Sequence, residues 1–494
     1  ATFGGGNDTI SLGGGNDTLN AGEGGVGTVN TYDGGDGSDV AQYGSSSTVN
    51  INPLTFTSDS NNKVTVKSTG TDTNGVDTLT NFEIFYGSLA NDTMDFSANA
   101  VQALTIGGNA GDDVIKGTQL ADTFNEYGLV YGAGSDTIYG LGGNDTFSLG
   151  SADGKNNTYD GGAGHDFAGY GGYTTGAINM LISMDSSNSV NAVVTGAGGI
   201  GTDTLTSFET YAGSASADTI TVDASVTGSA VLPASYLYLY GGAGNDTVNA
   251  SAASAPILYY GHATYDAGAD TVVLGSGNDQ VTAGLETAVA NDSYDGGAGR
   301  DTLLIGGYSP GASGTITLNS IGSWTLTGYS AGTDTFSNFE AVQGAQSGVD
   351  NFVLNYSTNT IASGSTPNLY LNGTSGLDVL TLGSGVNFSS ADNVSLQNVP
   401  IINMNSTSAN TFTISNSMFN SAGVVNAWSG TGLTSGDRMM MFQGTSADTL
   451  DIDKATWTST GTTFSSGGVT YDIWHNSALS IAGDMLIQQG ISVI

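Results

Sequence analysis

The chain has 494 residues, of which 45 are acidic and 7 are basic, so its formal net charge is −38 at pH 7. This charge excludes nucleic acid and anionic membranes as natural partners, because like charges repel. Cysteine is absent and no run of eighteen apolar residues occurs, so we expect no disulfide, no thiol chemistry and no transmembrane segment. The 77 glycines, against 6 prolines, favour repeated tight turns.

The first twenty residues contain two copies of one nonapeptide, with the pattern Gly-x-Gly-x-Asp-x-apolar. The glycines allow a turn with positive φ, which a Cβ atom would penalise. That turn directs backbone carbonyls to the point where the Asp carboxylate arrives, and Ca²⁺ takes six to eight such oxygens. A short strand, Thr9-Ile10-Ser11, follows the first aspartate. Alternation places Ile10 inside and its two neighbours outside.

This nonapeptide resembles the repeat of the RTX proteins, which Gram-negative bacteria export through type I secretion. The resemblance implies an all-β fold, a calcium-binding parallel β-roll or β-solenoid. One nonapeptide makes half a coil, and in this family a neighbouring turn completes the shell of each ion. The implied cofactor is Ca²⁺, bound at several sites.

The predicted calcium ligands are the glycines and aspartates with this spacing. They are Gly4, Gly6, Asp8, Gly13, Gly15, Asp17, Gly35, Gly37, Asp39, Gly111, Asp113, Gly134, Asp136, Gly143, Asp145, Gly162, Gly164, Asp166, Gly242, Gly244, Asp246, Gly268, Asp270, Gly277, Asp279, Gly297, Gly299 and Asp301.

Two further groups of aspartates are weaker candidates. Asp122, Asp218 and Asp448 lie in turns without the glycines, so we expect each carboxylate to cap its own turn. A second group precedes a glycine pair and is a candidate for an additional carboxylate ligand. It consists of Asp33, Asp160 and Asp295.

The nonapeptides are part of a longer repeat. Asp39, Asp166 and Asp301 occupy equivalent positions at intervals of 127 and 135 residues. The sequence therefore predicts three tandem solenoid units of about 130 residues, followed by a β cap. The predicted boundaries are 1–130, 131–264, 265–385 and, for the cap, 386–494. The apolar C-terminal tail also resembles the uncleaved signal of type I secretion substrates.

The segments between the turns are rich in β-forming residues, and no amphipathic helix is predicted. We expect the insertions 171–200 and 305–330 to leave the solenoid as loops or hairpins. We also expect strands near 469–474 and 485–491 to offer apolar surface for a contact between molecules.

The element Asp77-Thr78-Leu79-Thr80-Asn81-Phe82-Glu83 recurs twice, at 203–209 and 334–340. Its two carboxylates are an acid–base pair in one interpretation. We favour the other, in which Leu79 and Phe82 are buried and Glu83 braces a turn or binds an ion. The histidines His165, His262 and His475 are isolated in sequence, and His165 is expected to be exposed. No motif of a metalloprotease, serine hydrolase or P-loop protein occurs, so we predict that the chain is not an enzyme.

The preferred function is a secreted, calcium-binding structural protein at the cell surface, such as an S-layer subunit. The expected partner is the chain itself, in a lattice or filament, with cell-surface polysaccharide as a further candidate. Two alternatives stay open: an RTX adhesin or biofilm-matrix protein, and the repeat module of a larger exoenzyme. The chain starts at Ala1 within a repeat, without Met or a signal peptide, which indicates a processed or partial product.

Overall fold

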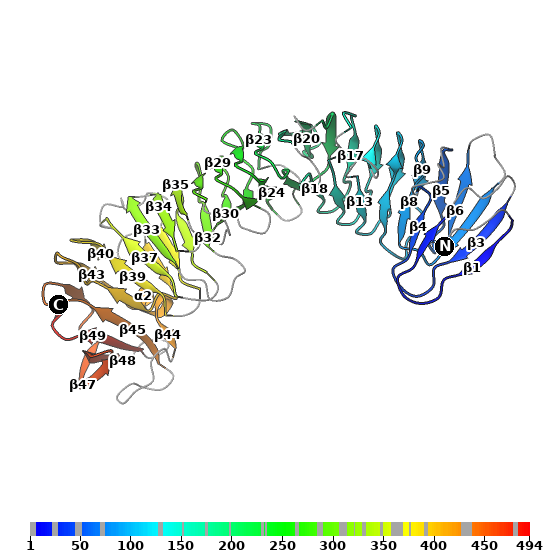
Figure 1. The fold of residues 1–494 in the computed structure, drawn as a ribbon. Coiled ribbons are helices and arrows are strands. Elements are labelled where there is room, and N and C mark those ends of the chain that lie inside the picture. Colours follow the sequence, from blue (N-terminus) through cyan, green and yellow to red (C-terminus); the bar gives the residue numbers. More distant parts are fainter. Residues whose placement is uncertain are drawn as a thin grey trace. The chain divides into compact units, whose positions relative to one another are not determined.

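The computed structural model describes residues 6–21, 28–44, 52–69, 75–126, 132–150, 153–172, 176–196, 199–228, 232, 235–261, 266–283, 290–305, 314–320, 322–328, 332–345, 349–356, 369–374, 377–389, 394–425, 437–477 and 483–494. The chain forms two compact units, Ala1–Ile257 and Leu258–Ile494. Both are built from short strands that alternate between stacked sheets (Figure 1).

The first unit contains two main sheets, which we call sheets I and II. Sheet I consists of β1 (Thr9–Ser11), β3 (Val29–Asp33), β5 (Leu54–Ser58), β6 (Val64–Ser68), β7 (Val76–Thr80), β9 (Thr93–Asp95), β12 (Val114–Lys116), β15 (Thr137–Tyr139), β17 (Thr158–Asp160), β19 (Ile178–Met184), β20 (Val190–Gly196), β21 (Thr202–Thr206), β23 (Thr219–Val222) and β26 (Thr247–Asn249). Sheet II consists of β2 (Thr18–Asn20), β4 (Val40–Gln42), β8 (Ile84–Tyr86), β10 (Thr105–Gly107), β13 (Thr123–Asn125), β16 (Thr146–Ser148), β18 (Phe167–Gly169), β22 (Thr210–Ala212) and β24 (Leu237–Tyr240). Three shorter pieces complete the unit: β11 (Asn109–Ala110), β14 (Gly132–Ala133) and β25 (Gly242–Ala243).

One coil of this solenoid is a strand of sheet I, a turn, a strand of sheet II and a second turn. Successive coils pair in parallel: β12 pairs with β15 and β15 with β17, while β13 pairs with β16 and β16 with β18. Because parallel strands in register place equivalent residues side by side, every position of the nonapeptide forms a row along the unit.

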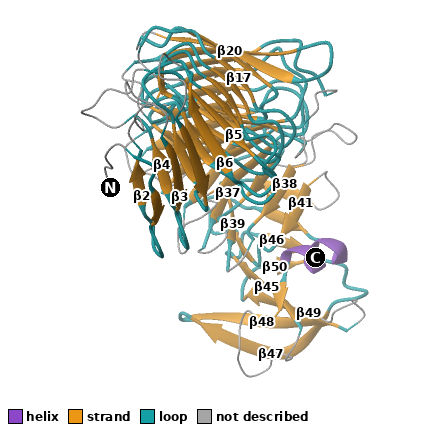
Figure 2. Ribbon diagram, turned by 90° about the vertical axis from the view of Figure 1, so that its right-hand side faces the viewer, coloured by secondary structure: helices purple, strands orange, loops and turns teal. Residues whose placement is uncertain are grey.

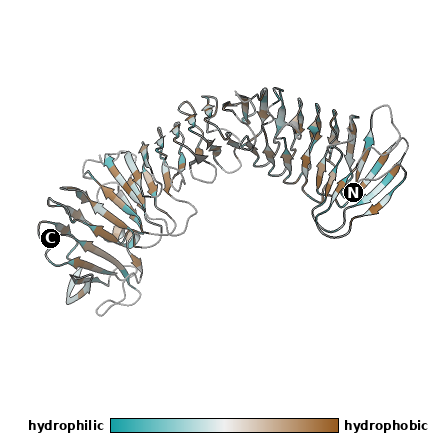
Figure 3. Cartoon of the chain, in the orientation of Figure 1, coloured by the Kyte–Doolittle hydropathy of each residue, from teal (hydrophilic) through white to brown (hydrophobic). Residues whose placement is uncertain are grey.

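The core of each coil is narrow. In most three-residue strands only the middle side chain is buried, as in β12, where Ile115 is fully buried between its neighbours. Hydrophobic and hydrophilic residues accordingly alternate along the strands (Figure 3). Phe124 and Phe147 stack from coil to coil with ring centroids 4.5 Å apart. Two buried side chains, each worth roughly 1.5–3 kcal/mol, cannot stabilise one coil alone, so stability depends on stacking.

Two hairpins are inserted within sheet I of this unit. The hairpin β5–β6 lies between β7 and β9, and the hairpin β19–β20 lies between β21 and β23. The expectation that the insertion 171–200 leaves the solenoid is therefore wrong for its described residues. The hairpin stays in the sheet because alternate residues of β19, such as Met180 and Ile182, are buried in the core.

The second unit repeats the same arrangement, with its own sheets I and II. Its sheet I consists of β29 (Thr271–Val273), β31 (Ser293–Asp295), β33 (Thr315–Ser320), β34 (Ser323–Thr327), β35 (Thr333–Ser337), β37 (Asn351–Leu354), β39 (Val379–Leu382), β42 (Ile401–Asn403), β44 (Val424–Val425), β45 (Arg438–Gln443), β47 (Thr458–Ser466), β48 (Val469–Asn476) and β49 (Gly483–Gln488). Its sheet II consists of β27 (Ile257–Gly261), which starts at the boundary, β30 (Gln280–Ala283), β32 (Thr302–Ile305), β36 (Ala341–Gln343), β38 (Leu369–Asn372) and β41 (Val394–Gln397). A third sheet contains β40 (Asn387–Ser389), β43 (Thr411–Thr413), β46 (Thr449–Asp451) and β50 (Ser492–Val493), and β28 (Asp266–Ala267) is separate from these.

The insertion 305–330 also forms an in-sheet hairpin. Strands β33 and β34 pair with each other and lie between β35 and β37. Trp324 anchors this hairpin, because its ring is buried and its Nε1 donates a hydrogen bond to the Phe339 carbonyl at 3.1 Å. The described residues of this insertion thus also contradict the prediction that it leaves the solenoid.

A short helix, α2 (Asn416–Ala422), covers the edge of sheet II in the second unit (purple in Figure 2). Ser415 caps its first turn, and Met418 and Phe419 are buried. Ser421 lies beside the edge strand β41, donating from its Oγ to the Leu396 carbonyl at 2.7 Å. The prediction of a chain without helices missed α2 because seven residues make only two turns.

The C-terminal strands bury their apolar residues instead of exposing them. Met441, Tyr471, Ile473 and Leu486 form one buried cluster across β45, β48 and β49. The exposed strand of this sheet is β47, which is almost entirely Thr, Ser and Gly. The expected apolar contact surface at 469–474 and 485–491 is therefore wrong. The all-β fold with long parallel sheets is confirmed, while the boundaries of three units and a cap remain a prediction.

Candidate calcium sites

The predicted aspartates stand at the turns that precede the strands. Asp145 precedes β16 and Asp166 precedes β18, so both lie at the entrance to sheet II. Asp113 and Asp136 precede β12 and β15 at the entrance to sheet I. In parallel pairing these residues align from coil to coil, and each unit therefore carries one row of acidic side chains per sheet.

One oxygen of each carboxylate joins neighbouring coils. The backbone amide of Asp122 donates to Asp145 Oδ1 at 2.7 Å, and the amide of Asp145 donates to Asp166 Oδ1 at 2.7 Å. The second unit repeats this contact from Asp279 to Asp301 at 2.7 Å and from Asp350 to Asp378 at 2.7 Å. Oδ1 is therefore a structural acceptor between coils, and the other oxygen is the one that these contacts leave for an ion.

The second oxygen, Oδ2, divides the aspartates into two classes. In one class it accepts hydrogen bonds from the protein. Asp122 accepts from the Thr118 amide at 2.6 Å, and Asp448 accepts from the Thr445 amide at 2.7 Å. Asp218 accepts likewise from the Ser214 amide at 2.5 Å. These turns lack the glycines, and their aspartates cap the turn as the sequence predicts.

Tyrosine hydroxyls serve other members of this class. Tyr43 donates to Asp77 Oδ2 and Tyr170 donates to Asp203 Oδ2, both at 3.0 Å. Tyr259 donates to Asp270 Oδ2 at 3.3 Å, so this predicted ligand already has a protein partner. A carboxylate oxygen that is satisfied in this way already has a partner without a cation.

In the other class the buried Oδ2 atom has no hydrogen-bond donor among the described residues. This class contains Asp17, Asp39, Asp113, Asp136, Asp145, Asp166, Asp301 and Asp378. All but Asp378 are predicted ligands. A buried, unsatisfied carboxylate oxygen is costly unless a cation neutralises it.

A glycine five residues before the aspartate provides a cradle for such an ion. A Cβ atom at Gly140 would lie 2.3 Å from Asp145 Oδ2 and 2.4 Å from the Gly161 carbonyl oxygen of the next coil. At Gly373 the same distances, to Asp378 Oδ2 and the Asn398 carbonyl, are 2.3 and 2.4 Å. Only glycine therefore lets the carboxylate and the carbonyl approach this closely. Carboxylate and carbonyl oxygens are the ligands that Ca²⁺ takes, so the chemistry of the residues present fits this ion.

The cradle glycines were not among the predicted ligands, although the sequence contained a signal for them. Some of them are the first members of glycine pairs, such as Gly161-Gly162 and Gly296-Gly297, whereas Gly140 and Gly373 precede Leu141 and Thr374. The second members, Gly162 and Gly297, have φ of 96° and 85° and form the left-handed turn. The two glycines thus serve different purposes, one to admit the carboxylate and one to turn the chain.

The other predicted ligands occupy the same turns. Left-handed φ values occur at Gly6, Gly13, Gly15, Gly35, Gly37, Gly111, Gly134, Gly143, Gly162, Gly164, Gly242, Gly244, Gly297 and Gly299. Gly268, Gly277, Asp8, Asp246 and Asp279 lie in equivalent turns. Gly4 lies outside the described residues, as does His262.

Burial raises the pKa of several aspartates of this class. It raises the pKa of Asp145 and of Asp301 to about 8, that of Asp378 to about 7 and that of Asp113 to about 10. Neighbouring carboxylates of the same row raise these pKa values further, because like charges oppose ionisation. The rows therefore require protons or cations at neutral pH.

The Phe-Glu elements brace these rows. Leu79 and Phe82 are fully buried, and Glu83 Oε2 accepts from the Asp39 amide at 2.8 Å. Glu209 and Glu340 accept in the same way from the amides of Asp166 and Asp301, at 2.9 and 2.7 Å. This confirms the structural interpretation of the element. Its aspartates, Asp77, Asp203 and Asp334, continue the row at sheet I, which the sequence did not reveal.

Two of the three aspartates before the glycine pairs have protein partners. Asp33 Oδ1 accepts from Asn81 Nδ2 at 2.7 Å, and Asp295 Oδ1 accepts from Asn338 Nδ2 at 2.6 Å. His165, expected to be exposed, is half-buried, and its Nε2 lies 2.7 Å from Thr210 Oγ1.

Glu126 is a buried acid that the sequence analysis missed. It follows β13 at the position that Tyr170 occupies after β18. Burial raises its pKa well above the ordinary value, and the nearby carboxylates of Asp136 and Asp113 raise it further. Where Tyr170 donates a hydrogen bond to the row, at Asp203, Glu126 adds a further carboxylate, so this coil also needs a cation or a proton.

The two classes of Oδ2 predict different effects of one substitution. Asp145→Asn replaces an unsatisfied oxygen by an amide, so the calcium content at saturation should fall by at least one ion per chain. Asp122→Asn is the matched control in the adjacent coil. It should leave the calcium content unchanged and destabilise the turn by about 1–3 kcal/mol, because an amide group would face the Thr118 amide. Elemental analysis after dialysis in millimolar Ca²⁺ measures both, and equal losses would contradict the two classes.

Comparison with known families agrees with this geometry. The RTX calcium-binding nonapeptide repeat, described as four copies, matches residues 4–25, 132–155, 238–253, 266–286 and 289–303. No curated protein matches the chain. Asp39, Asp113 and Asp166 lie outside the matched segments yet share the geometry of Asp145, which lies inside. The described residues include no helix with the length and apolar character of a membrane span. The matched repeats, together with the sheets that they build, support an RTX family for the chain.

Proposed function

We propose that the chain is a secreted structural protein whose subunits assemble, with Ca²⁺, into an ordered layer at the cell surface. The observation that carries the proposal is the class of buried aspartates whose Oδ2 atoms lack a donor among the described residues, which occurs in both units. These rows make calcium part of the fold. RTX repeat proteins are typically secreted, and extracellular calcium reaches the concentrations that such sites need.

The surface of the chain supports assembly through a divalent ion. Exposed carboxylates occur at turns and hairpin tips, for example Asp36, Asp59, Asp112, Asp185 and Asp453. With a net charge of −38, copies of the chain repel each other. Monovalent salt only screens this repulsion, whereas Ca²⁺ binds oxygens from two molecules at once.

The sheets themselves favour a structural role over a catalytic one. Both units contain stacked strands whose outward positions carry Thr, Ser and Asn, as in β16 of the first unit and β43 of the second. The proposed role is therefore non-enzymatic, and the proposed partner is a second copy of the chain. A cell-surface polysaccharide is the proposed anchor, because hydroxyl and amide side chains bind sugars by hydrogen bonds.

Electron microscopy of the purified chain tests the assembly. We expect ordered arrays in millimolar Ca²⁺, soluble subunits after chelation, and no recovery in NaCl of the same ionic strength, because Na⁺ cannot bridge carboxylates. Circular dichroism on the same samples separates loss of assembly from loss of folding. A folded chain that stays monomeric at high concentration in millimolar Ca²⁺ would contradict the layer and favour an adhesin or an exoenzyme module.

A further inference from the structure

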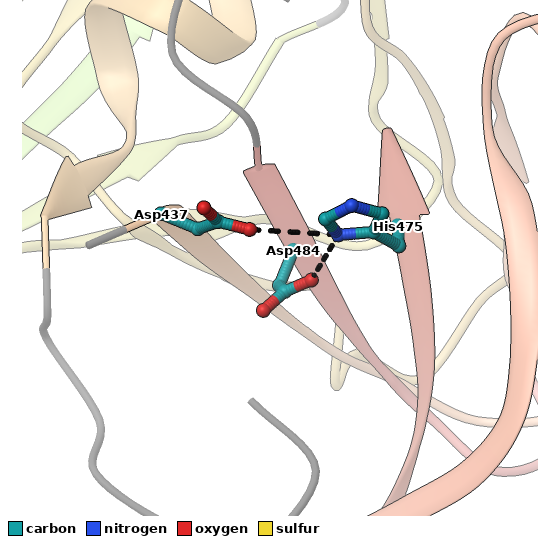
Figure 4. A group of neighbouring side chains, drawn as sticks. All are labelled: Asp437, His475 and Asp484. Atoms are coloured by element: carbon teal, nitrogen blue, oxygen red, sulfur yellow. Dashed lines mark hydrogen bonds and ion pairs between the residues drawn. The ribbon is translucent and has the colours of Figure 1, made fainter. Parts of the chain in front are cut away.

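Three metal-binding side chains meet at one end of the C-terminal sheet, in the second unit. His475 on β48 lies directly opposite Asp484 on β49 in their antiparallel register. Strand β45 runs parallel to β49 on its other side, and Asp437 immediately precedes β45. Three strands that are distant in sequence thus bring an imidazole and two carboxylates together (Figure 4).

The distances between the ligand atoms suit a small metal ion. His475 Nδ1 lies 2.8 Å from Asp484 Oδ1 and 3.5 Å from Asp437 Oδ2. Ligand atoms around a tetrahedral zinc ion, bound at about 2.0–2.2 Å, are separated by roughly 3.4 Å. The three ligand atoms all lie within 4.8 Å of one another, so one small ion can reach all three after side-chain adjustment.

The surroundings of the cluster favour a cation. Asp484 is 1% exposed and Asp437 is 6% exposed. The same strands carry the apolar cluster that includes Ile473 and Leu486, two residues from His475 and Asp484. Two buried carboxylates beside one imidazole are a ligand set of the kind that coordinates a divalent ion. A divalent ion neutralises both.

The imidazole distinguishes this cluster from the calcium rows. Ca²⁺ takes oxygen ligands, whereas imidazole with carboxylates suits Zn²⁺ and other first-row divalent ions. The His475 side chain is 28% exposed, which gives an ion access from solvent and leaves room for a water ligand. None of the three residues belongs to a nonapeptide turn, so the site is independent of the repeat.

We propose that Asp437, His475 and Asp484 form a site for a first-row divalent metal ion, for which Zn²⁺ fits best. The ion ties β45, β49 and β48 together at one end of the sheet. Because β49 lies between the other two strands, one ion there links all three. The proposal does not depend on surface-layer assembly, since the ligands all come from one chain.

The test is Zn²⁺ binding to the full chain in millimolar Ca²⁺, which keeps the calcium rows filled. Elemental analysis after dialysis measures the Zn²⁺ content. The unmodified chain should contain one Zn²⁺ more per chain than the variants His475→Gln and Asp484→Asn. His165→Gln is the matched control, because His165 lies in the solenoid beside Thr210, and it should retain the ion. Loss of a residue that only orients a metal ligand lowers metal affinity roughly 10- to 100-fold. Since His475 is itself a proposed ligand, its loss should weaken Zn²⁺ binding by at least that factor.

Two measurements on the unmodified chain keep the proposal falsifiable if a variant misfolds. Co²⁺ in place of Zn²⁺ should give the visible absorption of a tetrahedral site, and Zn²⁺ should slow amide exchange in β45, β48 and β49 beyond the effect of Ca²⁺. Zn²⁺ content that is unchanged in a folded His475→Gln variant would overturn the assignment. So would an unmodified chain that binds no Zn²⁺ in the presence of Ca²⁺.

Discussion

In calcium-free buffer at neutral pH, the chain is expected to lose most of its β-structure and to regain it cooperatively as Ca²⁺ rises. The reason is the row of buried aspartates: Asp145 and Asp166 hold neighbouring coils together through Oδ1, while Oδ2 lacks a donor among the described residues. Without an ion these charges repel along each row. A coil that buries only two or so apolar side chains cannot offset that repulsion.

Circular dichroism during a Ca²⁺ titration measures the transition, with its midpoint expected near 10⁻⁴–10⁻³ M, as for extracellular sites. NaCl at matched ionic strength is the control. It reduces repulsion between exposed charges but cannot coordinate a buried oxygen, so it should restore little structure. A native β spectrum in calcium-free buffer would show that apolar stacking alone holds the coils, and the calcium rows would then be secondary.

The turns and strands were predictable from the nonapeptide because the residues that determine each of them lie close together in the sequence. Two glycines, an aspartate and an apolar residue within nine positions determine one turn and one short strand. In β2, Thr18 is exposed and Leu19 is buried, as alternation requires. The parallel stacking of such strands follows directly, since only neighbouring coils can bury Leu19.

The in-sheet hairpins were not predictable in this way. Alternating residues of β19, such as Met180 and Ile182, predict a strand but do not say which strand lies beside it. The answer depends on pairing with β23, about 40 residues away, through Met180 beside Ile220. The role of Asp203 was unpredictable for the same reason. Its Oδ1 accepts a hydrogen bond from the amide of Asn157, which lies 46 residues away in the sequence and next to it in the row.

The C-terminal cluster was hidden for the same reason. His475 is an isolated histidine in sequence, and Asp484 belongs to no motif. They meet only because β48 and β49 pair in one antiparallel register, where a shift by one residue would place them on opposite faces. The two classes of Oδ2 also required the structure, because Tyr170 reaches Asp203 from the opposite sheet.

The calcium-free chain is expected to become more stable as the pH falls from about 8 to about 5. Burial raises the pKa of Asp166 to about 6 and that of Asp145 to about 8 in the folded chain. A raised folded-state pKa means that the fold binds protons more tightly than the unfolded chain, so stability is present in acid and is lost as the pH rises through the folded-state pKa. For Asp166 alone, raising the pKa by about two units lowers the free energy of unfolding at neutral pH by roughly 3 kcal/mol relative to acid.

The calcium-loaded chain should show the opposite dependence in the same range. Protons compete with Ca²⁺ for the carboxylates, so acid removes the ion and its stabilisation. Urea unfolding followed by circular dichroism at several pH values gives the slope for the calcium-loaded chain. The β signal of the calcium-free chain without urea, at the same pH values, gives the direction of the other slope. The calcium-free samples are prepared by dialysis, because chelators themselves lose affinity for Ca²⁺ in acid. Opposite signs of the two slopes identify the buried rows as the shared site of protons and Ca²⁺. Stability that rises with pH in the calcium-free chain would show that exposed carboxylates, with ordinary pKa values, control the response instead.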